Sequence, residues 1–168
     1  FRYECFERVR SEIREVEGAD APVRIAVAQN RNDRAETVLF RLLRGTGPDG
    51  LAAMDAERAD GIVRPLLSIE RTDIEAYCRA QGLTPCIDRS NREPVYARNR
   101  IRLELLPLLA RDYNPDVIAA LDRLSRIAAE DRAYFAGAVE DLCRETGVLE
   151  SGRLSRRFYA ALPPSLGK

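Results

Sequence analysis

The sequence contains no histidine, no tryptophan and a single lysine, Lys168. Histidine is the commonest general base and the commonest metal ligand in proteins, so its absence removes the usual forms of both chemistries. We expect no residue of this chain to bind a metal directly. No apolar run approaches the roughly 20 residues that a membrane-spanning helix requires, and no signal peptide is recognisable. The sequence therefore predicts a protein without a membrane partner.

Charge and cysteine content carry little information on function by themselves. The 27 basic residues balance 27 acidic ones, so a polyanionic partner must be bound by local clusters rather than by the field of the whole molecule. The four cysteines lie far apart in the sequence and include no C-x-x-C pair. We interpret Cys5, Cys78, Cys86 and Cys143 as reduced, mostly buried thiols of a cytoplasmic protein, and not as a zinc site or a disulfide framework.

The first half of the chain has the pattern of an open α/β sheet. Residues 3–17 place apolar side chains at helical spacing, and Gly18 follows them as the glycine that commonly ends a helix. Residues 23–28 are short and largely apolar, which is typical of a buried parallel strand, and residues 33–44 return to helical spacing. Residues 62–67 predict a short edge strand, because the proline among them cannot donate a sheet hydrogen bond. Alternation of helix and strand predicts an α/β fold.

The second half is helical. Residues 72–81 predict a helix that stops at Gly82, and residues 99–109 predict another that Pro107 kinks or ends early. From residue 114 to residue 146, apolar residues recur at nearly heptad spacing, which predicts a helix about 48 Å long. Such a helix is too long for a compact sheet domain. We therefore divide the chain into an α/β part, residues 1–112, and a helical part, residues 113–168.

One polar stretch, residues 30–37, lies where the strand gives way to the helix. Ligands bind outside the carboxyl ends of strands in open α/β sheets, and the N-terminus of a helix favours anions. The spacing of Asp33 and Glu36 also matches an acidic variant of the capping box, which is a purely structural feature and the interpretation that spacing alone favours. The two interpretations are compatible, because a capping carboxylate can also face a ligand.

Three further stretches are open to two interpretations. Glycines in residues 45–50 can offer N–H groups to a phosphate, but a helix cap followed by a turn is commoner. Residues 88–91 are compatible with an Asx turn. Arg98 and Arg102 lie one helical turn apart, where they can bind successive phosphates or pair on a solvated face with Glu104 and other carboxylates.

The order of these stretches is more specific than any one of them. The blocks are Asn30-x-x-Asp33-x-Ala35-Glu36-Thr37-Val38-Leu39, Arg41-Leu42-Leu43-Arg44-Gly45-Thr46-Gly47, Arg64-Pro65-Leu66-Leu67, Asp88-x-Ser90-Asn91, Tyr96-x-Arg98-Asn99-x-Ile101-Arg102 and Leu106-Pro107. Their sequence and gaps resemble the N-type ATP pyrophosphatase (PP-loop) family, and the later blocks resemble its lysidine synthetase branch. The resemblance extends from Phe1 to about Pro115.

The resemblance implies a fold and an activity. Residues 1–112 would be the C-terminal half of an ATP-binding domain with a partial Rossmann-like (adenine nucleotide alpha hydrolase-like) parallel sheet, followed by an all-helical region. Lysidine synthetases use ATP, with Mg²⁺, to adenylate the C2 oxygen of the wobble cytidine of tRNA(Ile) with a CAU anticodon. The ε-amine of free L-lysine then displaces AMP, which forms lysidine. Association into a homodimer is compatible with the sequence.

The resemblance also assigns roles to individual residues. Asp33 and Glu36 would be the catalytic carboxylates, with Asp33 the first choice for contacting the lysine ammonium. The residues of the nucleotide pocket would be Asn30, Thr37, Arg44, Gly45 and Gly47. The residues that brace the helical region or contact tRNA would be Arg64, Asp88, Asn91, Arg98, Asn99 and Arg102.

Some positions depart from the family pattern. Relatives often have histidines where this chain has Gln29-Asn30, so water, substrate or Asp33 must perform any proton transfer there. Arg34 replaces a usual glutamine. The Ser-Gly-Gly-x-Asp-Ser pyrophosphate loop is not found in these 168 residues, so we expect this piece alone neither to hydrolyse ATP nor to bind it tightly. A PP-loop tRNA thiolation enzyme and a non-catalytic tRNA-binding helical module are the alternatives.

Overall fold

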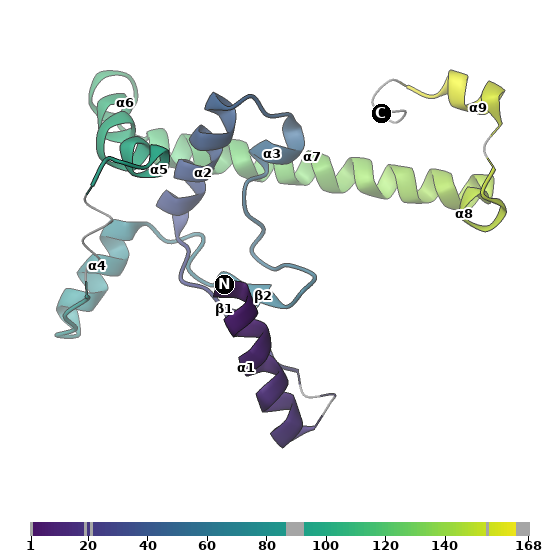
Figure 1. Ribbon diagram of the computed structural model, residues 1–168. Coiled ribbons are helices and arrows are strands. Elements are labelled where there is room, and N and C mark those ends of the chain that lie inside the picture. The colour runs from purple at the N-terminus through teal and green to yellow at the C-terminus, as the bar shows by residue number, and fades with distance from the viewer. Residues whose placement is uncertain (1, 19, 21, 87–92, 154, 164–168) are drawn as a thin grey trace.

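The computed structural model describes residues 2–18, 20, 22–86, 93–153 and 155–163 (Figure 1). Its elements are α1 (Arg2–Glu17), β1 (Ile25–Ala26), α2 (Arg31–Leu43), α3 (Pro48–Leu51), β2 (Ile62–Val63), α4 (Arg71–Ala80), α5 (Ala97–Arg100), the π-helix η2 (Ile101–Leu105), α6 (Leu106–Asp112), α7 (Val117–Thr146), α8 (Val148–Ser151) and α9 (Arg156–Ala161).

The sheet is short and parallel. Ile25 of β1 lies opposite Ile62 of β2, and Ala26 lies opposite Val63. This pairing confirms the predicted α/β class with a parallel sheet. The prediction that the first strand is buried is wrong, because Ile25 is only partly buried and Ala26 is exposed. In the described part of the chain only β2 pairs with β1, so the second edge of β1 has no neighbouring strand to cover it.

The hydrophobic core lies between helices rather than on the sheet. Ala35 and Val38 of α2 have no exposed surface, and Leu39 joins them against η2, α6 and α7. A buried ion pair, Arg34 Nη1 to Asp122 Oδ1 at 2.6 Å, connects α2 to α7 within the same interface. The N-terminal half of the long helix is therefore part of the body that holds α2.

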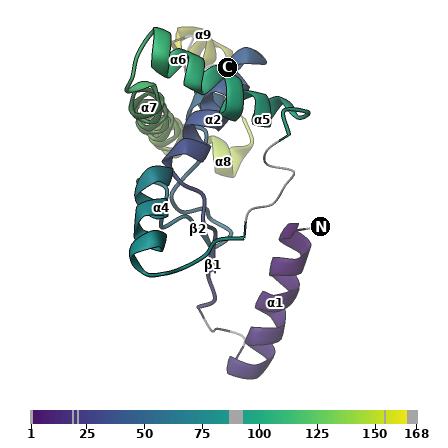
Figure 2. The same ribbon diagram turned by 90° about the vertical axis from the view of Figure 1, so that its left-hand side faces the viewer.

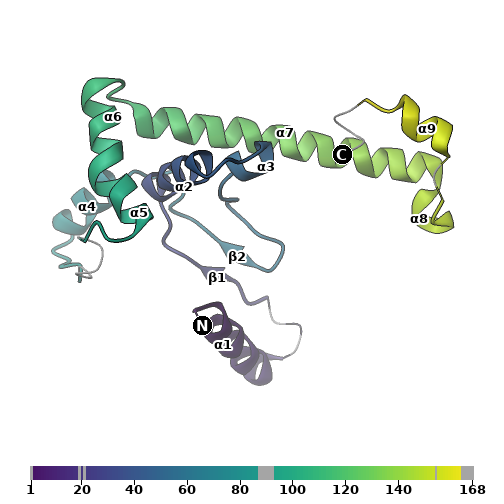
Figure 3. The ribbon, with the colours of Figure 1, turned by 45° about the horizontal axis from the view of Figure 1, so that its top comes forward.

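Helix α7 has 30 residues, which corresponds to about 45 Å and agrees with the predicted long helix. Its C-terminal half extends past α3 and leads into α8 and α9 (Figures 1 and 3). Gly147, with φ of 59°, ends it in the left-handed region that glycine adopts without strain. Helix α7 shares the core with α2, so the structure shows no separate core on each side of residue 112 among the described residues. The division of the chain into residues 1–112 and 113–168 remains a prediction.

Helix α1 lies apart from the helical layer, on the side of β1 and β2 (Figure 2). The expected end of this helix is confirmed, since Gly18 has a φ of 109°. Gly82 ends α4 in the same way, with a φ of 65°. The predicted early end at Pro107 is wrong, because α6 continues through the proline to Asp112; the irregularity is the π-helix η2, which ends at Leu105, two residues before it. Proline lacks the N–H that a continuous α-helix needs.

The prediction that the thiols are mostly buried is wrong. Cys5, Cys78 and Cys143 are only partly buried and Cys86 is exposed. All four lie on α1, α4, α7 or the segment after α4, at positions outside the core between α2, η2 and α7. Over the described residues, no helix combines the length and the apolar character needed to cross a bilayer.

Candidate functional site

The start of α2 is fixed by a reciprocal pair of hydrogen bonds. The Asp33 N–H donates to Asn30 Oδ1 at 3.1 Å, and the Asn30 N–H donates to Asp33 Oδ2 at 3.0 Å. This is a capping box, and it starts the helix at Arg31. The expected box between Asp33 and Glu36 is therefore wrong by one turn, because the asparagine before the helix already serves as the cap. Asp33 keeps its other oxygen, Oδ1, for contacts outside the helix.

Glu36 is a buried carboxylate held by arginines from a distant part of the chain. Its side chain is 1% exposed. Arg102 binds it with two parallel hydrogen bonds, Nε to Oε1 at 2.6 Å and Nη2 to Oε2 at 2.7 Å. Arg98 adds a third, Nε to Oε2 at 3.1 Å. Two-pronged guanidinium–carboxylate pairs are among the strongest polar contacts in proteins, so Glu36 fixes the orientation of both arginines. The hydrogen bonds that Arg102 donates to Glu36 also raise the pKa of Arg102 above its usual value.

A third arginine, Arg71 at the start of α4, completes the group. Its Nη2 lies 3.4 Å from Asp33 Oδ1 and 3.5 Å from Glu36 Oε1, and its main-chain N–H donates to Asn32 Oδ1 at 2.9 Å. Asp33 Oδ1 is also 3.3 Å from Arg102 Nη2. These contacts of Asp33 are longer than the about 2.7–2.9 Å of a strong charge-assisted hydrogen bond. Arg71 and Arg102 thus share Asp33 through long contacts, whereas Arg102 binds Glu36 through short hydrogen bonds.

We call Asp33, Glu36, Arg71, Arg98 and Arg102 the arginine–carboxylate cluster. Three guanidinium groups face two carboxylates, which leaves a net charge of +1. The side chains of Arg71 and Arg98 are 32% and 42% exposed, so both keep N–H groups facing solvent. The cluster can therefore attract an anion, and it offers one loosely held carboxylate to a cation.

The sequence did not predict Arg71 as a site residue. Arg71 follows the second parallel strand much as Asp33 follows the first. The carboxyl ends of parallel strands meet at one edge of a sheet, so this position was the available signal.

Arg64 braces the end of the sheet. It lies directly after β2 and donates from Nε to the Gln29 side chain and from Nη1 to the Asp55 main-chain oxygen at 2.6 Å. The Asp55 carboxylate in turn pairs with Arg132 of α7. Arg64 therefore connects the ends of both strands to the loop that contacts the long helix.

The remaining predicted residues lie away from the two carboxylates or make local contacts. The Thr37 hydroxyl donates to the Asp33 main-chain oxygen at 2.8 Å, and Asn99 Nδ2 donates to the Glu93 main-chain oxygen at 2.8 Å. Asp88 and Asn91 lie outside the described residues.

Arg44, Gly45 and Gly47 follow the C-terminal end of α2, about 18 Å along the helix from Asp33. Gly45 has a φ of 77° and turns the chain, and Gly47 precedes α3. The structure does not bring this loop to the arginine–carboxylate cluster, because α2 separates the two.

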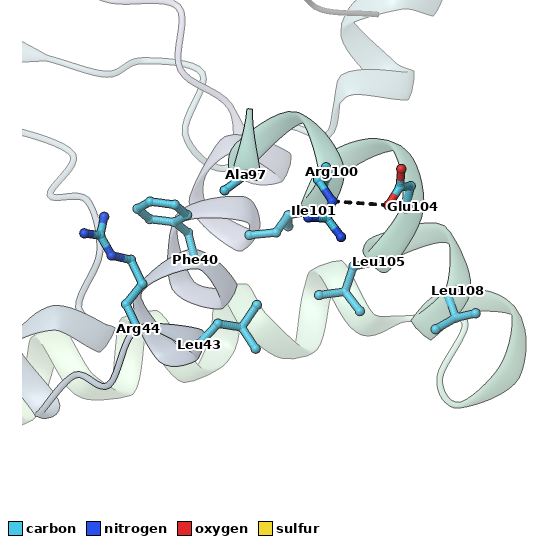
Figure 4. A pocket seen from close by; sticks show the side chains of 9 residues that line it. All are labelled: Phe40, Leu43, Arg44, Ala97, Arg100, Ile101, Glu104, Leu105 and Leu108. Carbon is cyan, nitrogen blue, oxygen red and sulfur yellow. Dashed lines mark ion pairs between the residues drawn. The ribbon is translucent and has the colours of Figure 1, made fainter. Parts of the chain in front are cut away.

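Arg44 instead lies at an apolar groove of about 710 Å³ (Figure 4). The groove runs between the C-terminal half of α2, with Phe40 and Leu43, and the α5–η2–α6 segment, with Leu105 and Leu108. The Arg44 guanidinium stacks over the Phe40 ring, 4.9 Å from its centre. Apolar side chains of α2 and of the α5–η2–α6 segment therefore line opposite sides of the groove, but Leu43 remains 65% exposed.

The cluster does not fit a metal ion. In the part of the chain that the structure describes, no three side chains of histidine, cysteine, aspartate or glutamate converge on one point. Asp33 and Glu36 also face guanidinium groups, which compete with a cation for the carboxylate oxygens.

Comparisons with known proteins agree with these features. The PP-loop domain family matches residues 1–109. The chain is 40% identical to the tRNA(Ile)-lysidine synthase of Clostridioides difficile (strain 630) over 152 residues, which cover 90% of this chain and 31% of that protein. It is 44% identical to the protein of the same name from Symbiobacterium thermophilum over 132 residues, 77% of this chain and 27% of the relative.

The chain is also 42% identical to the tRNA(Ile)-lysidine synthase of Thermosynechococcus vestitus over 145 residues, 84% of this chain and 40% of that protein. It thus spans less than half the length of these three relatives. The match to residues 1–109 includes α2, both strands and every residue of the arginine–carboxylate cluster. The chain belongs to the PP-loop domain family.

Proposed function

We propose that this chain is part of a cytoplasmic tRNA(Ile)-lysidine synthase. In this reaction the C2 oxygen of the wobble cytidine attacks the α-phosphorus of ATP, and pyrophosphate leaves. The ε-amine of free L-lysine then attacks C2, the bond to the adenylated oxygen breaks and AMP leaves. The amine must be unprotonated when it attacks, since only then does it carry a free electron pair.

One observation carries the proposal. The residues that the family motif singles out at the start of α2 and around α5 converge on a single, partly buried ionic cluster, although 62 and 66 residues separate Glu36 from Arg98 and Arg102. Ion pairs between residues that are distant in the sequence, placed near the ends of two parallel strands, favour a ligand site over a local helix cap. The identity of about 40% to proteins named for this activity supports the same function.

The two carboxylates have different roles in this proposal. Glu36 is closed to solvent and saturated by Arg102 and Arg98, so it positions guanidinium groups rather than touching substrate. Asp33 has the looser contacts and is 14% exposed. We assign Asp33 to the lysine ammonium, which displaces Arg71 as the partner of Oδ1. Asp33 or a water molecule then takes the proton, and the ε-amine attacks.

The exposed N–H groups of Arg71 and Arg98 fit the phosphates of ATP or of tRNA, because their positive charge exceeds that of the carboxylates beside them. Arg64, Arg102 and Asn99 belong to the framework of the junction with the helices. Magnesium would shield the nucleotide phosphates, but the described residues hold no group of three side chains that could bind it.

The test is the chemical identity of the product. The full-length protein that contains this chain is incubated with tRNA(Ile) bearing a CAU anticodon, ATP and isotope-labelled lysine, and the digested tRNA is analysed by mass spectrometry. The proposal predicts a cytidine that has gained labelled lysine. A thiolated cytidine would instead indicate the sibling thiolation activity, and unchanged tRNA that still binds the protein would indicate a non-catalytic module.

A further inference from the structure

Arg64 is a buried cation whose partners carry no charge. It is 7% exposed, and among the described residues its hydrogen-bond acceptors are the Gln29 side-chain amide and the Asp55 main-chain carbonyl. Across the described residues, no carboxylate oxygen pairs with it, and the Asp55 carboxylate is engaged by Arg132. A buried charge without an opposite charge is unfavourable, so an anion at this position would stabilise the protein.

The cavity beside Arg64 contains a second buried guanidinium. It has a volume of about 330 Å³ and is lined by Arg34, Arg64 and Ser68 among others. The Arg34 side chain is 9% exposed; its Nη1 pairs with Asp122, while its Nε has no hydrogen-bond partner among the described residues. Two like charges at one cavity repel each other, and an anion relieves that repulsion.

Among the described residues, the cavity wall offers no free carboxylate to neutralise these arginines. Of the residues that line the cavity, Glu57 is the acidic one, and it pairs with Arg24 at 2.6 Å. Asp122 already faces both Arg34 and, at 3.4 Å, Arg126. The positive charge of Arg64 therefore remains uncompensated by the described chain.

The position of the cavity also favours a ligand. Arg64 follows the end of β2, and Gln29 follows the end of β1, so the cavity lies at the carboxyl edge of the parallel sheet. The volume leaves room for a phosphate group and several waters, since one water takes about 30 Å³ in the liquid. In the described part of the chain, Nη2 of Arg64 donates to no acceptor and can serve as a ligand donor.

We infer that this cavity binds a phosphate-type oxyanion, held by Arg64 and by the positive charge of Arg34. The site is separate from the arginine–carboxylate cluster and does not depend on the proposed activity. The same chemistry is present in inorganic pyrophosphate, which is a product of nucleotide cleavage, and in the backbone of an RNA. The experiment must distinguish these two sources.

The test uses the chain uniformly labelled with ¹⁵N, in which the side-chain Nε–Hε resonance of Arg64 is followed by NMR. Sodium pyrophosphate, sodium phosphate and a short single-stranded oligoribonucleotide are titrated separately at constant ionic strength. Ser68→Glu places a carboxylate at the exposed rim of the cavity, where it competes with the anion. Ser11→Glu adds the same charge on the exposed face of α1 and is the matched control.

We expect saturable movement of the Arg64 resonance, retained in Ser11→Glu and weakened at least tenfold in Ser68→Glu, with unchanged circular dichroism in both variants. Response to pyrophosphate or phosphate identifies a free anion, and response to the oligoribonucleotide alone identifies an RNA backbone phosphate. If none of the three moves the Arg64 resonance at millimolar concentration, or if Ser68→Glu binds as tightly as Ser11→Glu, the inference is overturned.

Discussion

Replacement of Glu36 by glutamine is expected to lower the free energy of unfolding by about 3 kcal/mol. The carboxylate is 1% exposed and accepts hydrogen bonds at 2.6, 2.7 and 3.1 Å from Arg102 and Arg98. Loss of one partner of a buried ion pair costs roughly 3–5 kcal/mol. The lower end of this range applies because the Arg102 and Arg98 side chains are 20% and 42% exposed. Water can therefore partly solvate the two guanidinium groups when the carboxylate is lost.

The assay is urea unfolding followed by circular dichroism. Glu104→Gln is the matched control, since Glu104 pairs with Arg100 at 3.6 Å on an exposed surface and the same substitution there should cost less than about 0.5 kcal/mol. If Glu36→Gln destabilises the chain no more than Glu104→Gln does, Glu36 is not the anchor of the arginines and the reasoning fails.

Three further predictions concern the core and the surface. Arg34→Met leaves Asp122 buried without its closest partner and should lower the free energy of unfolding by about 3 kcal/mol. Arg34→Met combined with Asp122→Leu should recover most of that stability in urea unfolding. An equal loss of stability in the double variant would contradict this. Val38→Ala, at a site with no exposed surface, should lower the unfolding free energy by about 2 kcal/mol, and a neutral result would mean that α2 and α7 do not pack as described. The hydrogen bond from Arg111 lowers the pKa of Asp112 below its ordinary 3.8. The stabilising effect of this pair is therefore present above pH 3.8 and is lost as the pH falls through the lowered pKa. Arg111→Gln should raise the Asp112 pKa in an NMR titration, and an unchanged pKa would refute the pairing.

Features set by neighbouring residues could be predicted from the sequence. Gly18 and Gly82 end their helices because a left-handed residue is needed there, and a π-helical stretch precedes Pro107, which lacks the N–H of a regular α-helix. The position of the Asp33 turn after a strand also followed from local pattern. These rules act over a few residues, so a single sequence contains all that they need.

Features set by distant residues could not be predicted. The spacing of Asp33 and Glu36 allowed a capping box, but Asn30 provides the cap, and Glu36 is instead buried by arginines from beyond residue 97. For Arg71 the sequence offered only its position after the second strand, since its contacts depend on how α4 lies against α2. The exposure of β1 likewise depends on which strands pair with it rather than on its apolar composition.

The most direct measurement is the lysine dependence of lysidine formation by the full-length protein with Asp33→Asn. Loss of a hydrogen bond to a charged group costs about 1.5–3 kcal/mol, so we predict that the KM for lysine rises roughly 10- to 150-fold while the KM for ATP and the circular dichroism stay nearly unchanged. Asp49→Asn, on the exposed surface of α3, should behave as the unaltered protein. A lysine KM close to normal in Asp33→Asn would contradict the assignment of Asp33 to the lysine ammonium.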